Sequence, residues 1–287
     1  MNLLALALVL TSATLHAAWN LLAKRVARGA AFIWLITAAA AVVYAPLGVY
    51  LIWQQRPRLG PLEFGFIGFS ALLHVGYMLS LQRGYRAGDL SLVYPLARGT
   101  GPALAVTGAV LLFGERPGPI AIAGVALVVG GAFVLAGGER MFRSVDGKAV
   151  GYGLLTGLFI ASYTLADAFV VTELALHPLV FLWLAELVRV ILLTPTALRR
   201  RAEVGELWAG RRREIVAVAI MSPLAYLLVL GAFRIAPVSY VAPAREISIL
   251  IGAALGAGFL REGKLGRRLG AALVMVLGVY ALTLPPL

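Results

Sequence analysis

The chain alternates between long apolar stretches and short links that hold most of its charged residues. The apolar stretches are residues 3–22, 30–53, 62–82, 90–113, 118–137, 149–171, 178–198, 214–233, 238–260 and 266–284. Each is about 20 residues long, the length that a helix needs to cross a hydrocarbon core of about 30 Å. We therefore predict an all-α polytopic membrane protein with ten transmembrane helices. The first stretch lacks the basic start of a cleaved signal peptide, so we expect it to be retained as a helix.

The basic residues of the links are biased toward one side of the predicted membrane. The odd-numbered links hold 18 Lys and Arg residues, whereas the even-numbered links hold four. Cytoplasmic loops collect Lys and Arg, so we expect the odd-numbered links in the cytoplasm and both termini on the other side of a bacterial-type inner membrane. The longest link, residues 199–213, is basic and amphipathic, and no link is long enough to hold a soluble domain.

The composition supports a membrane protein and argues against several other classes. Hydrophobic residues make up 61% of the chain and charged residues 13%, whereas a soluble domain has about a quarter of its residues charged. The basic links account for the formal net charge of +12, so we expect no nucleic-acid partner. The chain has no Cys, no His/Glu spacing typical of metal sites and no paired catalytic carboxylates. We expect a protein that is not an enzyme, with no catalytic residues, no metal and no cofactor.

The two halves of the chain resemble each other. Residues 86–95 align with residues 234–243, and shortly afterwards Arg98 aligns with Arg245. Each half has five predicted spans, an odd number, so equivalent residues lie in opposite membrane orientations. Inverted repeats of this kind are typical of secondary transporters. The predicted five-helix repeats are residues 1–140 and residues 141–287.

A motif at the end of the fourth span is similar to that of a known family. The run Leu111–Pro117, followed by Gly124 and by the pair Gly130 and Gly131, has an echo over residues 260–278. With these motifs, the chain resembles the ten-helix EamA-type branch of the drug/metabolite transporter superfamily over nearly its whole length. The resemblance implies a central cavity lined mainly by the third, fourth, eighth and ninth helices and their neighbours. It also implies transport of a small metabolite, without specifying which one.

Two arginines inside the predicted spans are the first candidates for a substrate site. Arg98 and Arg245 lie at matching depths, about 10–13 Å into their helices at about 1.5 Å per residue. A charge at the bilayer centre costs at least about 2.5–3.5 kcal/mol, so each should face protein or water and have a partner. Together they would form a fork-shaped receptor for a carboxylate, phosphate or phosphonate. The alternative is that each neutralises a buried acid, for which Glu246 is the obvious candidate.

Other ionisable residues within the spans also have two interpretations. Glu186 and Arg189 are three residues apart, which favours a local ion pair, although Glu186 is also a candidate for a proton relay. Glu246 is either a coupling acid that exchanges a proton or a counter-ion of an arginine. His16 and His74 either line the pathway or donate hydrogen bonds between helices.

Aromatic residues add candidates for the cavity lining. Trp19, Tyr77, Tyr94, Tyr163 and Trp183 lie on helix faces suited to line a cavity, although plain packing is an equally good interpretation of each. The remaining aromatics near span ends are typical of an interfacial belt. These are Tyr44, Trp53 and Tyr280.

Three further acids are expected to lie outside the site. Glu115 and Glu262 align at the ends of the fourth and ninth helices, each beside an arginine, so we expect caps or hinge contacts. Asp167 lies near the external end of the sixth helix, and we expect it to reach the membrane interface.

The sequence thus favours a secondary transporter that moves an anionic or zwitterionic solute through the bilayer by alternating access, with a coupled proton as a possible partner. One alternative is an exporter of cationic or neutral drug-like compounds or amino acids, using Glu186, Glu246 and the aromatics. An alternative of another class is an intramembrane enzyme or a non-transporting receptor. Both repeats lie in one chain, so no oligomer is required to form the cavity.

Overall fold

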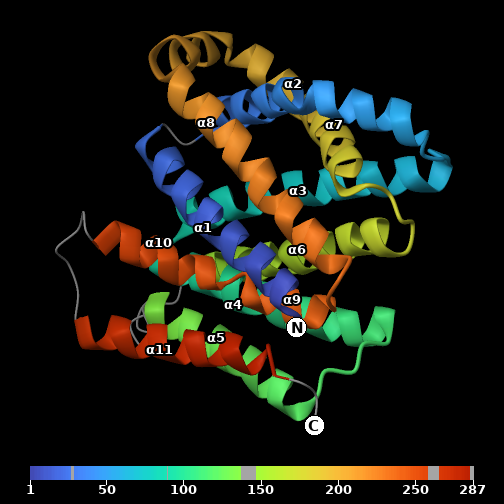
Figure 1. Ribbon diagram of the computed structural model, residues 1–287. Helices are drawn as coiled ribbons and strands as arrows, with labels where there is room; N and C mark the ends of the chain where they lie inside the picture. The colour runs from blue at the N-terminus through green and yellow to red at the C-terminus, as the bar shows by residue number, and fades with distance from the viewer. Residues whose placement is uncertain (27–28, 89, 137–146, 258–264, 285–287) are drawn as a thin grey trace.

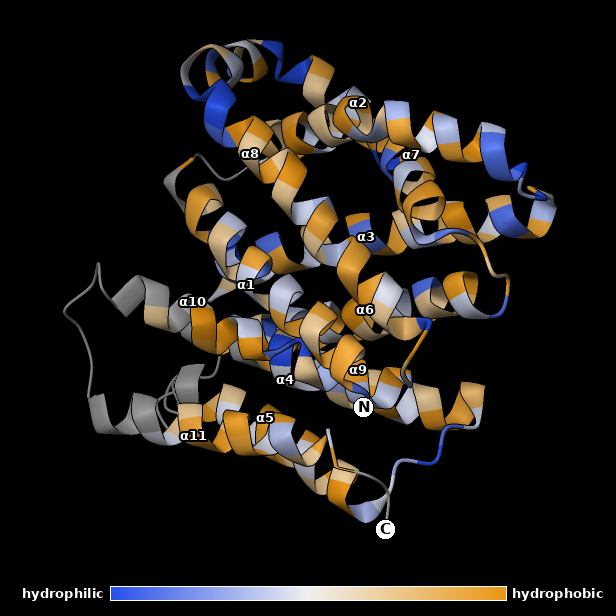
Figure 2. Cartoon of the chain, in the orientation of Figure 1, coloured by the Kyte–Doolittle hydropathy of each residue, from blue (hydrophilic) through white to orange (hydrophobic). Residues whose placement is uncertain are grey.

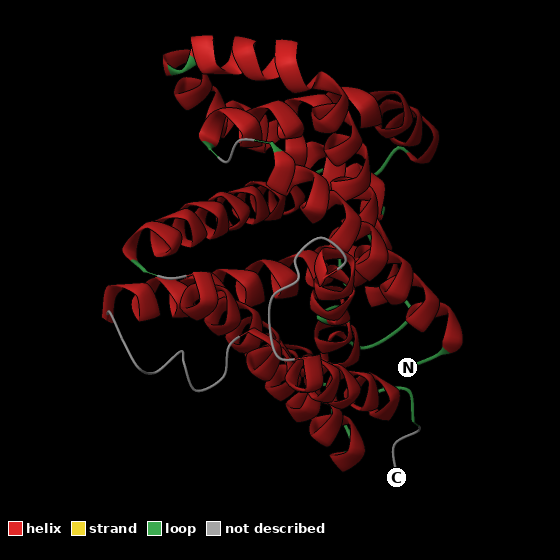
Figure 3. Cartoon of the chain, turned by 90° about the vertical axis from the view of Figure 1, so that its left-hand side faces the viewer, coloured by secondary structure: helices red, strands yellow, loops and turns green. Residues whose placement is uncertain are grey.

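The computed structural model describes residues 1–26, 29–88, 90–136, 147–257 and 265–284, and these residues fold into helices without strands (Figure 1, Figure 3). The helices are α1 (Leu3–Arg25), α2 (Ala30–Gln55), α3 (Pro61–Ala87), α4 (Leu90–Phe113), α5 (Pro119–Ala136), α6 (Gly147–Thr172), α7 (Pro178–Arg199), α8 (Arg201–Phe233), α9 (Val238–Ala244), α10 (Ile247–Ala257) and α11 (Leu265–Ala281). Helices α1 to α4 and α6 to α8 are each long and apolar enough to cross a membrane. The all-α fold with ten spans is confirmed, with α9 and α10 sharing the ninth.

The ninth span is broken, whereas the apolar pattern predicts one continuous helix over residues 238–260. Helix α9 ends at Ala244 and α10 begins at Ile247, so Arg245 and Glu246 lie in a turn between them. Pro243 has no backbone N–H, so it cannot donate a hydrogen bond to the preceding turn of the helix. Just after it, the amide of Glu246 donates to the carbonyl of Pro243 at 3.0 Å, which is three residues back and not the four of an α-helix. The prediction of a continuous helix is therefore wrong at the two residues that carry its charges.

The basic link before the eighth span is helical, not a loop. Helix α8 begins at Arg201 and bends at Arg211, where φ is −136° and ψ is 22°. Buried residues begin only at Ile215. The segment before the bend is hydrophilic along much of its length (Figure 2). Its exposed basic residues are consistent with a helix that lies outside the apolar layer.

The helices of the two halves intercalate. In the first half, α1 packs along α8 and α10, and in the second half α6 packs along α3 and α4 in the same manner. Helix α2 packs on α7 and α5 packs on α11, so helices at the same place in the two halves also contact each other (Figure 1). This pattern is that of an inverted repeat, in which each half completes the other. The boundary predicted at residues 140 and 141 lies outside the described residues.

Helices α5 and α11 approach each other through glycines. A Cβ atom added to Gly124 would lie 2.8 Å from the carbonyl oxygen of Gly278, and one added to Gly278 would lie 2.8 Å from the carbonyl oxygen of Gly124. Only glycine permits this backbone contact. Both glycines belong to the family motif and its echo, so the motif marks the crossing of the two repeats.

The start of α1 and the end of α11 lie on the same side of the molecule (Figure 1). The amino group of Met1 donates a hydrogen bond to the carbonyl of Leu282 at 3.1 Å. An even number of spans requires this arrangement. Of the side chains expected at the lipid interface, Trp53 is 70% and Tyr280 62% exposed. Tyr44 is half-buried, and its hydroxyl donates to the carbonyl of Ile220 at 2.7 Å.

Candidate functional site

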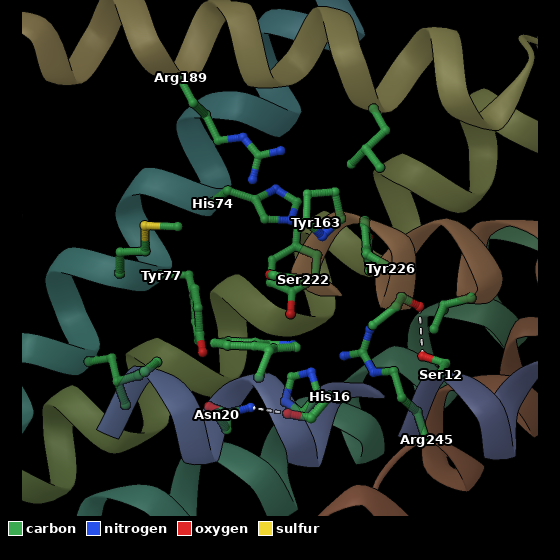
Figure 4. Close-up of a pocket in the computed structure, with 18 of the residues that line it drawn as sticks. Ser12, His16, Asn20, His74, Tyr77, Tyr163, Arg189, Ser222, Tyr226 and Arg245 are labelled. Carbon is green, nitrogen blue, oxygen red and sulfur yellow. Dashed lines mark hydrogen bonds between the residues drawn. The ribbon is translucent and has the colours of Figure 1, made fainter. Parts of the chain in front are cut away.

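A cavity of about 310 Å³ lies between the two halves, lined by helices α1 to α4, α6 to α8 and the break before α10. Ten of the eleven site residues predicted from the sequence line it. They are His16, Trp19, His74, Tyr77, Tyr94, Arg98, Tyr163, Glu186, Arg189 and Arg245. Figure 4 labels His16, His74, Tyr77, Tyr163, Arg189 and Arg245 among them. The eleventh, Glu246, is fully buried directly behind Arg98. Helices α1 and α7 contribute more of the lining than the family resemblance implies.

Arg98 is held by two partners from different helices. Its Nη1 atom lies 3.4 Å from Oε1 of Glu246, and its Nη2 atom lies 2.9 Å from Nε2 of His16. An arginine only donates, so Nε2 of His16 accepts and the imidazole is neutral with its proton on Nδ1. The guanidinium also lies 5.5 Å from the ring centre of Tyr94, one turn earlier on α4. Arg98 is therefore neutralised and fixed in place.

Arg245 is in the opposite situation. Its side chain makes no ion pair and no hydrogen bond with the residues that the structure describes, although the residue is only 7% exposed. It extends from the break between α9 and α10 into the cavity (Figure 4). Glu246, its neighbour in the chain, points to Arg98 instead. No described residue thus occupies the guanidinium donors of Arg245, which face the cavity.

Helix α7 brings an ion pair to the same cavity. Nη2 of Arg189 lies 2.8 Å from Oε1 of Glu186, so the local pair that their spacing favours is present. Both residues are buried, at 7% exposure each. The Oε2 atom of Glu186 accepts no hydrogen bond from the described residues. This pair neutralises its own charges within lipid.

Aromatic rings form one wall of the cavity. His74 stacks on Tyr163 at 4.1 Å between ring centres, and Tyr77 and Tyr226 each meet Tyr163 edge-on. Trp19 lies edge-on to His16 at 4.9 Å. Such rings present both apolar faces and polar tips to a solute.

Trp183 was a further candidate for the aromatic lining, but it does not line the cavity. Its Nε1 atom donates to the carbonyl of Ala41 at 2.9 Å, and its ring packs on Gly48 of α2. The packing interpretation of this residue is therefore correct.

The sequence interpretation missed Asp167 and Tyr226. The expectation that Asp167 reaches the interface is wrong, because the residue is 0% exposed. The hydroxyl of Tyr226 donates to Oδ2 of Asp167 at 2.5 Å, and Nε2 of His74 lies 3.9 Å from the same oxygen. Tyr226 lies in the middle of its span, as Tyr163 does. The criterion that selected Tyr163, an aromatic residue on a helix face suited to line a cavity, would also have selected Tyr226.

Glu115 acts as a cap between the two halves, as the sequence predicts. Its carboxylate accepts hydrogen bonds from the backbone amides of Val238 at 2.7 Å and Ser239 at 2.9 Å, at the start of α9. These are amides that a helix leaves without internal partners. Its counterpart Glu262 lies outside the described residues.

The site can bind and neutralise charge. Among the described residues, no group of three His, Asp or Glu side chains is placed to hold a metal ion. The available chemistry is a free guanidinium, two ion pairs, a buried carboxyl beside an imidazole, and an aromatic wall.

Comparison with known proteins agrees with this architecture. Residues 3–137 match the model of the EamA-like transporter family. A solved protein, described only as a crystal structure of a protein, superposes with a TM-score of 0.75 over 97% of this chain and 96% of that chain, at 17% identity. That likeness shows the fold alone. No curated protein matches the sequence. The first half of the chain, α1 to α5, is thus similar to the EamA-like transporter family, and the chain is a multi-pass membrane protein.

Proposed function

We propose that the protein is a secondary transporter that carries a small anionic or zwitterionic solute, with Arg245 as the group that binds its negative charge. The observation that carries the proposal is that Arg245 is buried and faces the cavity without a protein partner among the described residues. A buried arginine is costly in a membrane unless something neutralises it. A carboxylate, phosphate or sulfonate that accepts two hydrogen bonds from the guanidinium would supply that charge.

Arg98 has a supporting role in this proposal. Glu246 and His16 occupy its donors, so it forms part of the cavity lining and leaves Arg245 as the arginine that meets the solute. Tyr77, Tyr94, Tyr163, His74 and Trp19 contact the rest of the solute in this arrangement. Such a cavity, with a few polar groups on an aromatic wall, is the usual form of a small-molecule site.

Transport follows an alternating-access cycle in which the two five-helix halves, residues 1–140 and 141–287, rock against each other. The break at Arg245 gives the ninth span a joint at the site itself. Glu115, in the link after α4, accepts hydrogen bonds from the start of α9, so a movement of one half is transmitted to the other. The basic links lie on the cytoplasmic side of an inner membrane, with both termini opposite. One chain is sufficient for the cycle.

A second candidate is an exporter of cationic or neutral compounds. The observation in its favour is Glu186, which lines the cavity and has one oxygen without a partner among the described residues. The pair with Arg189 weighs against it, because that pair already neutralises the carboxylate. The sign of the preferred solute charge distinguishes the two candidates.

A set of ring-matched ligands tests that sign. Benzenesulfonate, phenylalanine, benzyl alcohol and benzyltrimethylammonium share one ring and differ in charge. Thermal unfolding of the purified protein in detergent reports binding, since a ligand at one hundred times its Kd stabilises the fold by about 2.7 kcal/mol. We expect stabilisation by benzenesulfonate or phenylalanine, lost in Arg245→Ala and kept in the control Arg234→Ala, which alters an exposed arginine.

The contrary result is equally clear. Stabilisation by benzyltrimethylammonium alone, lost in Glu186→Gln and kept in Arg245→Ala, would replace this proposal with the cation exporter. Uptake of the stabilising ligand, radiolabelled, into proteoliposomes then distinguishes a transporter from a receptor that only binds.

A further inference from the structure

We propose that Asp167 and His74 form a proton-binding pair, and that proton binding at this pair is linked to solute binding at Arg245. The linkage rests on the proposed function, whereas the proton-binding pair stands on its own geometry. The pair lies on helices α6 and α3, one from each half of the chain. His74 lines the cavity, on the opposite side from His16 in the view of Figure 4.

The hydrogen bond on the far side of His74 fixes where its proton lies. Nδ1 of His74 is 3.0 Å from the carbonyl oxygen of Ser70. A carbonyl oxygen only accepts, so Nδ1 carries the hydrogen and donates it. In the neutral ring, Nε2 is then a bare acceptor, and it faces Oδ2 of Asp167 at 3.9 Å. Two acceptors face each other there, so one added proton relieves the contact when it resides on Asp167 as a carboxyl O–H that is directed at Nε2.

Asp167 has little else to stabilise a negative charge. It is 0% exposed, Oδ2 accepts one hydrogen bond from Tyr226, the hydroxyl of Ser70 lies close to the carboxyl group, and Oδ1 accepts no hydrogen bond from the described residues. A buried carboxylate normally needs several donors or a close cation. Arg189 and Arg245 act on it electrostatically, but neither forms an ion pair with it. Its position suits a carboxyl that gains and loses a proton.

The surrounding helices set the electrical background of the pair. Their ionisable groups around the cavity are His16 on α1, His74, Tyr77 and Tyr85 on α3, Tyr94 and Arg98 on α4, Tyr163 on α6, Glu186 and Arg189 on α7, Tyr226 on α8, and Arg245 at the break. Three arginines and three carboxyl groups, counting Asp167 and the buried Glu246, cancel in charge. One proton on the pair leaves the site with one net positive charge, which matches a solute with one net negative charge. Proton and anion are therefore expected to bind together and to cross the membrane together.

Each transport cycle takes up one proton on one side of the membrane and releases it on the other. One proton enters from the aqueous phase on the side where the solute binds and is held between Asp167 and His74. It leaves on the other side when the anion leaves, because the free site is neutral without it. In this scheme Tyr226 is a positioning residue, whose hydroxyl favours the ionised form of Asp167.

Binding of benzenesulfonate at different pH values tests the linkage, since this ligand stays ionised throughout. Between about pH 5 and pH 8, uptake of one proton per anion tightens binding by up to about tenfold for each unit that the pH falls. Asp167→Asn imitates the protonated carboxyl, so we expect it to bind at pH 8 about as tightly as the wild-type protein binds at pH 5. The control Glu173→Gln, an exposed acid just beyond α6, keeps the wild-type slope. If the affinity of Asp167→Asn for benzenesulfonate depends on pH as steeply as that of the wild-type protein, Asp167 is not the proton-binding residue.

Infrared spectroscopy tests the pair without any ligand. Acidification of the wild-type protein should produce the C=O band of a protonated carboxyl group that is missing in Asp167→Asn and retained in Glu173→Gln. In Tyr226→Phe, the band should appear at higher pH. If the wild-type and Asp167→Asn proteins give the same band, the proton-binding pair is refuted. Absence of benzenesulfonate binding at every pH refutes the anion site and its linkage, while the infrared result decides the pair independently.

Discussion

Arg98 and Arg245 occupy matching places in the two repeats, yet their surroundings differ in every respect that matters for binding. Arg98 lies in the continuous helix α4 and is held by Glu246 and His16. Arg245 lies in the break between α9 and α10, and its side chain has no partner among the described residues. A repeated sequence has therefore produced one structural arginine and one that is free to bind.

The difference arises from residues that the repeats do not share. The residue after Arg98 is Gly99, whereas the residue after Arg245 is Glu246. Residues 16–21 of the first half align with residues 160–165 of the second, which places Ile160 opposite His16. Each half thus supplies one partner, and both partners serve Arg98. Internal symmetry of the fold need not be symmetry of the site.

The largest effect is expected from separating Arg98 and Glu246. Glu246→Gln leaves Arg98 buried without a counter-ion, and Arg98→Met leaves Glu246 in the same state. Each change should lower the free energy of unfolding by about 3–5 kcal/mol. The double variant Arg98→Met with Glu246→Gln should recover most of that loss. Thermal unfolding in detergent measures all three, and additive losses in the double variant would contradict the pairing.

The same substitution at the matched position should have the opposite sign. Arg245→Met removes a buried charge that has no protein partner, so we expect the free energy of unfolding to rise by about 1 kcal/mol. Binding of benzenesulfonate should weaken by at least about tenfold, because hydrogen bonds to charged groups contribute about 1.5–3 kcal/mol. Thermal unfolding with and without ligand measures both. A destabilisation as large as that of Arg98→Met would mean that Arg245 has a structural partner.

Much of this site could be predicted from the sequence, because the lipid bilayer restricts where ionisable side chains can lie. Polar and ionisable residues inside apolar spans must face protein or water. This rule alone brings His16, His74, Arg98, Glu186 and Arg245 to one cavity, where the structure has them. The repeat then predicts that the two arginines lie at matching depths.

The pairing within the site was not predictable. Adjacent residues on a helix point in different directions, so Glu246 cannot turn toward Arg245 and reaches across to α4 instead. The depth of Asp167 depends on how α3 and α8 cover the end of α6, which spacing along the chain does not determine. The break at Arg245 likewise depends on Pro243 together with the local packing, since prolines at other positions leave their helices intact.

His16 provides the finest test of the comparison, because it is a neutral partner of Arg98 that its counterpart lacks. His16→Ala removes one acceptor but leaves Glu246 in place, so we expect a loss of only about 1 kcal/mol in thermal unfolding. Thr14→Ala on the exposed face of α1 serves as the control, because it removes a hydroxyl that bonds only within the helix. The same variant should also gain affinity for a second anionic group, such as that of a benzenedisulfonate, since one Nη2 donor of Arg98 becomes available beside Arg245. If His16→Ala destabilises the protein as much as Glu246→Gln does, the imidazole is not a neutral acceptor. His16 would then have to be counted among the charges of the site, and the comparison of the two arginines would change accordingly.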